Sequence, residues 1–126
     1  MISFEHFAME ENVPIYLQIN GFIKRGIVAG IIVDADEVPS RRMLSALLGV
    51  NPNTVQKSYA MLEEEGLLSS RPGAKSCIRV TEETVDRLRQ QLLQDSLRAM
   101  VENMKQMGMT CAQAQETIAR LWEVEG

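Results

Sequence analysis

The sequence predicts a mainly α-helical fold with a small β-wing: a winged helix-turn-helix followed by a two-helix C-terminal extension. Three patterns predict it. Apolar residues recur at helical spacing in residues 14–66, residues 67–80 read as strand, Pro-Gly turn and strand, and a long apolar stripe follows residue 81. With 126 residues, 45% hydrophobic and 24% charged, the chain has the composition of a globular protein with one small domain and an extension.

Residues 1–13 are short and mixed in composition, and we expect an N-terminal arm there. A first helix follows, because Pro14 suits a helix start and four isoleucines recur at four-residue spacing before Gly30. The β-branched run 31–33 then predicts a short strand. These elements open the winged helix-turn-helix domain that we expect over residues 14–80.

Two further helices form the predicted helix-turn-helix. The first begins at residues 39–40 and ends at Gly49. The second begins at Asn51, an N-cap, with Pro52 as its first helical residue, and it ends at Gly66. At about 100° per residue, its apolar stripe lies opposite a compact side that is free of acidic residues. That side consists of Asn53, Gln56, Lys57 and Ala60.

The last third of the chain predicts two more helices. Thr81 suits a cap of the first, Gly108 breaks the pattern, and Thr110 and Gln113 fit a capping box. Two helices cannot bury so wide an apolar stripe between themselves, so we expect residues 81–126 to be a helical dimerisation region of a homodimer. The expected dimer interface consists of Leu88, Leu92, Met100, Met104, Ile118, Leu121 and Trp122.

Charge is distributed unevenly along the chain. The net charge of −4 at first argues against a nucleic-acid partner. Residues 38–80, however, hold six basic and three acidic residues, and this local charge of +3 is what would meet phosphates. The three acidic residues, Glu63 to Glu65, end the second helix of the helix-turn-helix, so that end should point away from nucleic acid.

Three motifs occur in order within residues 14–80: Pro39-Ser40-x-Arg42-x-Leu44, Leu48-Gly49-Val50-Asn51-Pro52-Asn53-Thr54-Val55 and Leu62-Glu63-x-Glu65-Gly66-Leu67. They resemble the DNA-binding domain of GntR-type bacterial transcription regulators. The short helix pair that follows resembles the YtrA-type subfamily, whose members dimerise through these helices. The resemblance implies a homodimeric, sequence-specific DNA-binding transcription regulator on a palindromic operator, a repressor of its own or a transporter operon.

The chain departs from that family pattern at two places. Asp34-Ala35 stand where the family carries Pro-Gly, and the wing reads Gly73-Ala74-Lys75 without the family's second glycine. The path of the wing therefore does not follow from the resemblance, although Lys75 adds a cation that suits phosphate.

The resemblance also implies DNA contacts. It places Ser40 and Arg42 at phosphate or base, Gly73 near the minor groove, and Asn53, Thr54 and Gln56 in the major groove. Side-chain chemistry supports this, because glutamine and asparagine amides match adenine and arginine matches guanine or phosphate. A proline at the helix start leaves the next amides, of Asn53 and Thr54, free for a phosphate. The full candidate set is Ser40, Arg41, Arg42, Asn51, Asn53, Thr54, Gln56, Lys57, Arg71, Gly73 and Lys75.

Other classes of protein find little support. We expect no enzyme, metal or cofactor, because no nucleophile–base set, metal-ligand spacing or phosphate loop occurs, and the two distant cysteines suit reduced thiols. The chain lacks both a signal peptide and an apolar run of the ~20 residues that a membrane span needs, so we expect it in the cytoplasm. The alternative is a winged helix used for protein–protein contact, which leaves the acid-free helix face unexplained. The operator and any small-molecule effector are not specified.

Overall fold

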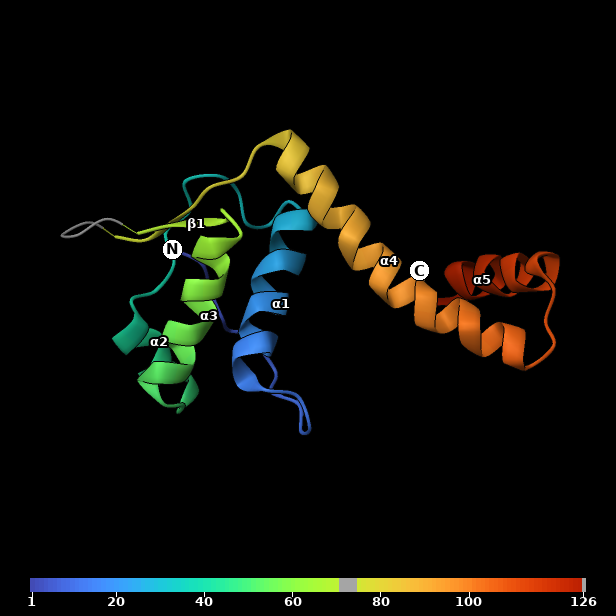
Figure 1. Cartoon of the computed structure of the whole chain (residues 1–126), viewed down its shortest axis with the longest axis horizontal. Coiled ribbons are helices and arrows are strands. Elements are labelled where there is room, and N and C mark those ends of the chain that lie inside the picture. The colour runs from blue at the N-terminus through green and yellow to red at the C-terminus, as the bar shows by residue number, and fades with distance from the viewer. Residues whose placement is uncertain (71–74, 126) are drawn as a thin grey trace. The chain divides into compact units, whose positions relative to one another are not determined.

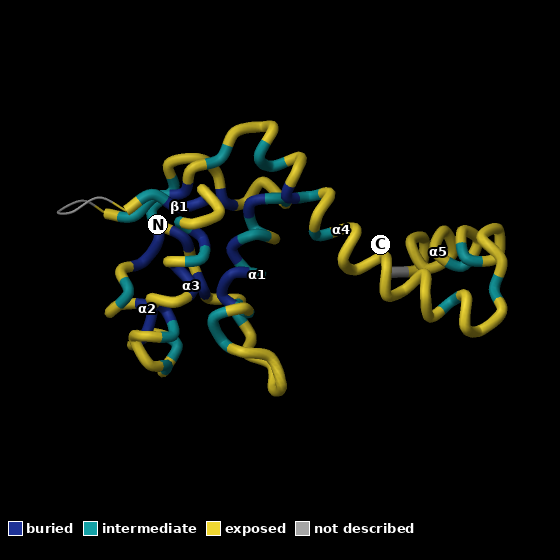
Figure 2. The backbone as a smooth tube through the Cα atoms, in the orientation of Figure 1, coloured by how far each residue is buried: buried dark blue, intermediate teal, exposed yellow. Residues whose placement is uncertain are grey.

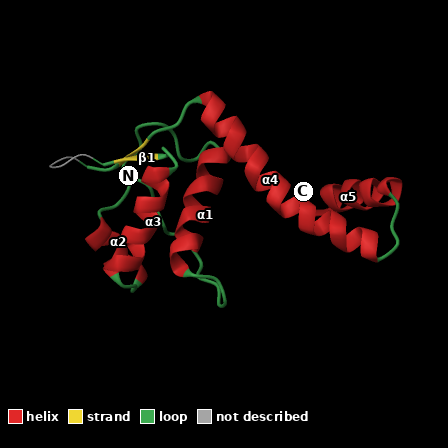
Figure 3. Ribbon diagram, in the orientation of Figure 1, coloured by secondary structure: helices red, strands yellow, loops and turns green. Residues whose placement is uncertain are grey.

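The computed structural model describes residues 1–70 and 75–125, and the elements in that part of the chain occur in the predicted order (Figure 1, Figure 3). They are α1 (Ile15–Val28), α2 (Arg41–Leu48), α3 (Pro52–Glu64), β1 (Leu68–Ser69), β2 (Cys77–Ile78), α4 (Glu82–Gln106) and α5 (Cys111–Glu125). The winged helix-turn-helix followed by two helices is confirmed. The chain divides into two compact units, one ending at Leu88 and one beginning at Arg89.

The core of the first unit lies between its three helices, where Figure 2 places most of the buried positions. Helix α3 packs against both α1 and α2. The fully buried apolar side chains of α1, α2 and α3 come from the predicted apolar faces, which confirms the helical spacing: Ile19, Ile23, Ile27, Leu44, Val55, Tyr59 and Leu62.

Side-chain caps fix where α2 and α3 begin, and the one at Asn51 was predicted. The Ser40 hydroxyl accepts a hydrogen bond of 3.1 Å from the Met43 amide, and Asn51 Oδ1 accepts one of 2.8 Å from the Asn53 amide. Gly49 ends α2 with φ 68°, a left-handed conformation that glycine adopts without strain. These local devices fix the turn between α2 and α3.

The wing is a short hairpin beside the loop that precedes α2. Leu68 pairs with Ile78 and Ser69 with Cys77 in an antiparallel register. A separate antiparallel bridge between Glu37 and Cys77 brings a third backbone segment beside β2. The base of the wing is therefore tied to the residues that lead into the helix-turn-helix.

The strand predicted at residues 31–33 is wrong. Only its middle residue, Ile32, is buried, and both neighbours are exposed. The amides of Ile31 and Ile32 each donate a 3.0 Å hydrogen bond to the Gly26 carbonyl, so they satisfy the end of α1 instead of pairing with a strand. Pairing with β2 begins later, at the amide of Ala35.

Ala35 occupies the position where the GntR pattern carries glycine, and it has φ 72°. Its amide donates a 2.8 Å hydrogen bond to the Ile78 carbonyl, and the neighbouring Asp34 carboxylate accepts one of 2.9 Å from the Val80 amide. The residue at this position of the turn is thus left-handed, although it is alanine and not the glycine of the family pattern. An alanine in this conformation is strained by its Cβ.

The expected N-terminal arm is packed against the first unit. Ile2 and Phe4 are buried, and the Ile2 amide donates a 2.9 Å hydrogen bond to the Glu37 carbonyl. The Phe4 ring stacks on Phe22 of α1 with 4.9 Å between ring centroids. Residues that lack regular structure therefore still contribute to the core.

The second unit comprises the greater part of α4 together with α5. Gly108 separates them with φ 76°, and the predicted capping box forms. The Thr110 hydroxyl accepts from the Gln113 amide at 3.2 Å, while the Gln113 side chain accepts from the Thr110 amide at 2.9 Å. Figure 2 shows that this unit is largely exposed. Among the described residues, no helix is both long enough and apolar enough to cross a membrane.

Candidate nucleic-acid interface

The outward side of α3 is the exposed face predicted from the sequence. Asn53, Gln56, Lys57 and Ala60 are exposed, whereas the residues between them on the other side are buried. The exposed positions include no acidic residue until the end of the helix. This confirms the predicted division of α3 into a core stripe and a polar face.

Contacts to α1 and α2 hold α3 in place. The buried side chains of Asn20 on α1 and Ser58 on α3 are hydrogen-bonded to each other. The Tyr59 hydroxyl donates a 2.7 Å hydrogen bond to the Pro39 carbonyl, just before α2. Burial raises the pKa of Tyr59 well above its ordinary value, although the positive charge of Arg41 lowers it in part, so the phenol remains a donor.

The start of α3 differs from the prediction. The Asn53 amide donates to Asn51 Oδ1 at 2.8 Å, and the Thr54 amide donates to the Asn51 backbone carbonyl at 2.9 Å. The prediction that the amides of Asn53 and Thr54 are free to meet a phosphate is therefore wrong, because the N-cap occupies both. Asn51 thus acts on this surface by setting where α3 begins.

Arg41 joins α2 to α3 through a cluster of side chains that the sequence did not predict. Its Nε donates to Gln56 Oε1, and its Nη2 donates to Glu63 Oε1 at 3.0 Å. The guanidinium also lies over the ring of Tyr59, 5.2 Å from the centroid. Glu63 Oε1 accepts a further 2.8 Å hydrogen bond from the Ser70 hydroxyl, next to β1. Two candidate DNA contacts, Arg41 and Gln56, are therefore bound to each other.

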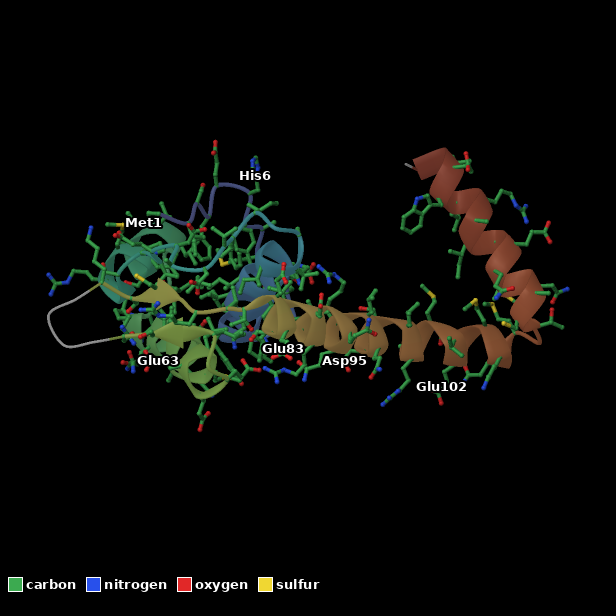
Figure 4. All side chains as sticks on the ribbon, turned by 90° about the horizontal axis from the view of Figure 1, so that it is seen from above. Met1, His6, Glu63, Glu83, Asp95 and Glu102 are labelled. Carbon is green, nitrogen blue, oxygen red and sulfur yellow. The ribbon has the colours of Figure 1, made fainter. Side chains whose placement is uncertain are left out.

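Glu63 has partners that the sequence did not indicate. The sequence grouped it with Glu64 and Glu65 at a helix end that should point away from nucleic acid, and the structure places it at the junction of α2, α3 and the wing. In Figure 4, Glu63 and His6, the chain's single histidine, lie at opposite edges of the first unit. The spacing of 22 residues between Arg41 and Glu63 carries no local signal that would have revealed the pair.

Of the other predicted cations in the described part of the chain, Arg42 lies on α2, Lys57 on α3 and Lys75 just before β2. Lys57 Nζ lies 4.1 Å from the centroid of the Tyr16 ring, and Lys75 Nζ lies 3.4 Å from Glu37 Oε2. Ser40 and Arg42 are exposed at the start of α2, and Thr54 is half-buried. Arg71 and Gly73, which were predicted at the wing, lie outside the described residues.

Within residues 1–70 and 75–125, no group of three or more His, Cys, Asp or Glu side chains is placed to hold a metal ion. The chemistry available on this surface is hydrogen bonding by amides and hydroxyls together with positive charge. Phosphates and base edges are the groups that such side chains recognise in DNA.

Residues 15–77 match the family described as bacterial regulatory proteins, gntR family. The chain belongs to the GntR family. The predicted family and the predicted DNA-binding regulatory class are therefore confirmed, and the family is one of transcription regulators rather than enzymes.

Two relatives of this GntR chain align with most of its length. The HTH-type transcriptional regulator YhcF of Bacillus subtilis is 34% identical over 110 residues, which are 87% of this chain and 91% of YhcF. The HTH-type transcriptional repressor YtrA of the same organism is 33% identical over 94 residues, 75% of this chain and 68% of YtrA. These similarities confirm the YtrA-like subfamily.

Solved structures resemble both the whole chain and its DNA-binding part. A GntR family transcriptional regulator from Listeria monocytogenes has a TM-score of 0.82 at 25% identity, covering 89% of this chain and 98% of its own. The AraR DNA-binding domain, solved in complex with operator ORX1, has a TM-score of 0.50 at 28% identity, covering 56% of this chain and 86% of its own. AraR thus provides a GntR-type domain bound to operator DNA.

Proposed function

We propose that this GntR-family chain is a homodimeric repressor that binds a palindromic operator in the cytoplasm and controls its own or a transporter operon. The exposed, acid-free face of α3 carries the proposal, because a helix-turn-helix reads DNA through the outward face of its second helix. The repressor function is supported by the similarity to YtrA, which is a repressor. The transporter operon rests on the resemblance to YtrA-type regulators alone.

The proposed DNA contacts divide into two kinds. Asn53 and Gln56 carry amides that match base edges, so we assign them to sequence reading in the major groove. Lys57, Lys75 and Arg42 carry charge around that face and are assigned mainly to phosphate. Ser40 and Thr54 add hydroxyl contacts, Asn51 caps the helix, and Arg71 and Gly73 remain proposed wing contacts from the sequence pattern.

The proposed dimer interface lies in the second unit. Met100 is 56% exposed, Leu121 55% and Trp122 78%, and Ile118 is exposed as well. Each Å² of such surface that leaves water contributes about 25 cal/mol, so a second copy is the simplest way to cover it. Leu92 and Met104 are half-buried and stay in the interface, whereas Leu88 is buried in the first unit and is left out.

Homodimerisation fits operator binding because two identical recognition helices require two half-sites related by a two-fold axis. A dimer that binds both half-sites at once has a higher overall affinity for the operator than one protomer has for one half-site. A palindromic operator is therefore the expected DNA partner of the full chain.

A gel-shift titration tests the proposal. The full chain is titrated against duplex DNA from upstream of its own operon and against a shuffled duplex of equal length and composition, at several salt concentrations. We expect tighter binding of the upstream duplex, with two chains per duplex. Equal affinity for both duplexes would contradict sequence-specific regulation there, and no DNA binding at all would favour the alternative of a protein–protein interaction module.

A further inference from the structure

The contact between Arg41 and Gln56 bears on which base the helix-turn-helix reads. We propose that Arg41 is a specificity-determining positioning residue: it orients the Gln56 amide so that the NH₂ group, rather than the oxygen, meets the DNA base. Guanine fits this group best, because its major-groove edge carries two adjacent acceptors. The inference rests on the proposed function, because it requires α3 to enter the major groove.

The orientation of the Gln56 amide follows from hydrogen-bond chemistry. Arg41 Nε can only donate, so the Gln56 atom that faces it must be the acceptor Oε1. A reversed amide would bring two donors together and leave both without an acceptor. Both N–H donors of the amide are then on Nε2, which has no hydrogen-bond partner among residues 1–70 and 75–125. Gln56 therefore offers donors to an incoming ligand.

The acceptor pattern of guanine matches this presentation. Guanine exposes two acceptors side by side in the major groove, N7 and O6, whereas adenine exposes the acceptor N7 and the donor N6. Glutamine reads adenine by donating to N7 while its oxygen accepts from N6. The Gln56 oxygen has a second lone pair, but its bond to Arg41 directs the oxygen toward α2 and leaves the NH₂ group for the base. A donor-only contact with guanine is therefore favoured. Without Arg41, the same side chain would suit adenine, as the sequence alone predicts.

Arg41 is itself held from several sides, so the orientation exists before DNA arrives. Its Nη2 donates to Glu63 at 3.0 Å, and its guanidinium lies over the Tyr59 ring, 5.2 Å from the centroid. The Arg and Glu side chains are 33% and 36% exposed, so this ion pair is partly shielded from solvent. The arrangement uses the fork of the guanidinium, which a lysine ammonium does not reproduce.

The same cluster reaches the base of the wing. Glu63 Oε1 also accepts from the Ser70 hydroxyl at 2.8 Å, and Ser70 Oγ lies 2.6 Å from Ser76 Oγ, within hydrogen-bond distance. Ser70 directly follows β1 and Ser76 directly precedes β2. One carboxylate thus fixes both the side chain that orients Gln56 and the two ends of the wing hairpin.

The ion pair of Arg41 with Glu63 makes a positioning role distinguishable from a phosphate contact by experiment. A cation that neutralises a phosphate releases counterions and steepens the salt dependence of binding by about 0.9 per contact. Arg41 keeps its ion pair when it only positions Gln56, so it adds nothing to that slope. Arg42, the exposed neighbour on α2, has no ion pair among the described residues and is the matched control.

Selection from a randomised duplex library tests the base assignment. The full-length wild type is compared with Arg41→Met, which keeps an aliphatic chain over Tyr59 but has no donor, and with Gln56→Ala. We expect the wild type to select guanine at one symmetric pair of positions. Gln56→Ala should lose that preference, and Arg41→Met should shift it toward adenine by about tenfold.

Each outcome of the selection is informative. A wild type that selects no sequence would overturn the proposed function itself. A wild type that selects a palindrome while Arg41→Met retains the guanine would overturn only the inference. If Arg41 reads guanine directly, the preference survives in Gln56→Ala, which also overturns the inference.

Binding isotherms at several salt concentrations on the selected duplex provide a second readout. Arg41→Met should leave the slope unchanged, whereas Arg42→Met should flatten it by about one ion per protomer. The double variant of Arg41 and Gln56 should discriminate guanine from adenine no better and no worse than Gln56→Ala alone. A flattened slope in Arg41→Met, or additive losses in the double variant, would overturn the inference. Thermal melts confirm that each variant is folded.

Discussion

Removal of one hydroxyl, in Tyr59→Phe, should measurably destabilise the helix-turn-helix. The phenol is fully buried and donates a 2.7 Å hydrogen bond to the Pro39 carbonyl, which joins α3 to the segment before α2. Phenylalanine fills the same space, so the loss is the penalty of about 1–3 kcal/mol for leaving the buried Pro39 carbonyl without its hydrogen bond. We expect the free energy of unfolding to fall by about 2 kcal/mol, a decrease in Tm of roughly 8–16 °C.

The same substitution should change the pH dependence of stability. Burial raises the pKa of Tyr59 above its ordinary value of 10.0, with Arg41 opposing this in part. The folded state therefore holds the phenolic proton more tightly than the unfolded state does. That contribution to stability is complete below pH 10.0 and is lost as the pH rises above it. The wild type should lose stability above this pH more steeply than Tyr59→Phe does.

Thermal unfolding followed by circular dichroism, near neutral pH and above pH 10, measures both effects. Tyr16→Phe is the matched control, because it removes the same hydroxyl from a half-buried ring and keeps the aromatic face below Lys57. We expect the control to change stability by no more than about 0.5 kcal/mol. An unchanged Tm in Tyr59→Phe, or parallel pH profiles of variant and wild type, would refute this reasoning.

Four further outcomes are expected. Trp122→Ala in the full chain should raise the dimer dissociation constant about 30-fold, because loss of an aromatic anchor costs about 2 kcal/mol of binding free energy. Sedimentation equilibrium measures this constant, and an unaltered dimer would contradict the proposed interface. Gln56→Ala should weaken binding to the cognate duplex by about 1–3 kcal/mol and leave shuffled DNA nearly unaffected, which isotherms on the two duplexes measure. Lys75→Ala should weaken binding to both duplexes and lower the salt slope by about one ion per contact, whereas an unchanged slope would place the wing away from the backbone. Ala35→Gly should raise stability by roughly 1 kcal/mol in a denaturant titration because it relieves a left-handed alanine, and Gly49→Ala should do the reverse.

Much of the interface was predictable because its signals are local. The caps of α2 and α3 at Ser40 and Asn51 act over two or three residues, and the exposed face of α3 follows from helical periodicity alone. The family motifs lie in the same continuous stretch. Such features depend on the covalent neighbourhood of each residue, and so they can be read directly from the sequence.

The sequence by itself therefore determined the order of the helices and the wing, the approximate helix boundaries, the polar face of α3 and the GntR family. Only the tertiary structure decided which side chains on that face are free. Arg41 and Gln56 are 15 residues apart and Asn20 and Ser58 are 38 apart, and the packing of α3 against α2 and α1 brings each pair together. The amides of residues 31 and 32 likewise donate to the Gly26 carbonyl at the end of α1. The apolar pattern of the sequence does not show which carbonyl a backbone amide will bond. Hydrogen bonds between residues that are distant in the chain depend on how the helices pack in three dimensions. The periodicity and the motifs of the sequence do not specify that packing.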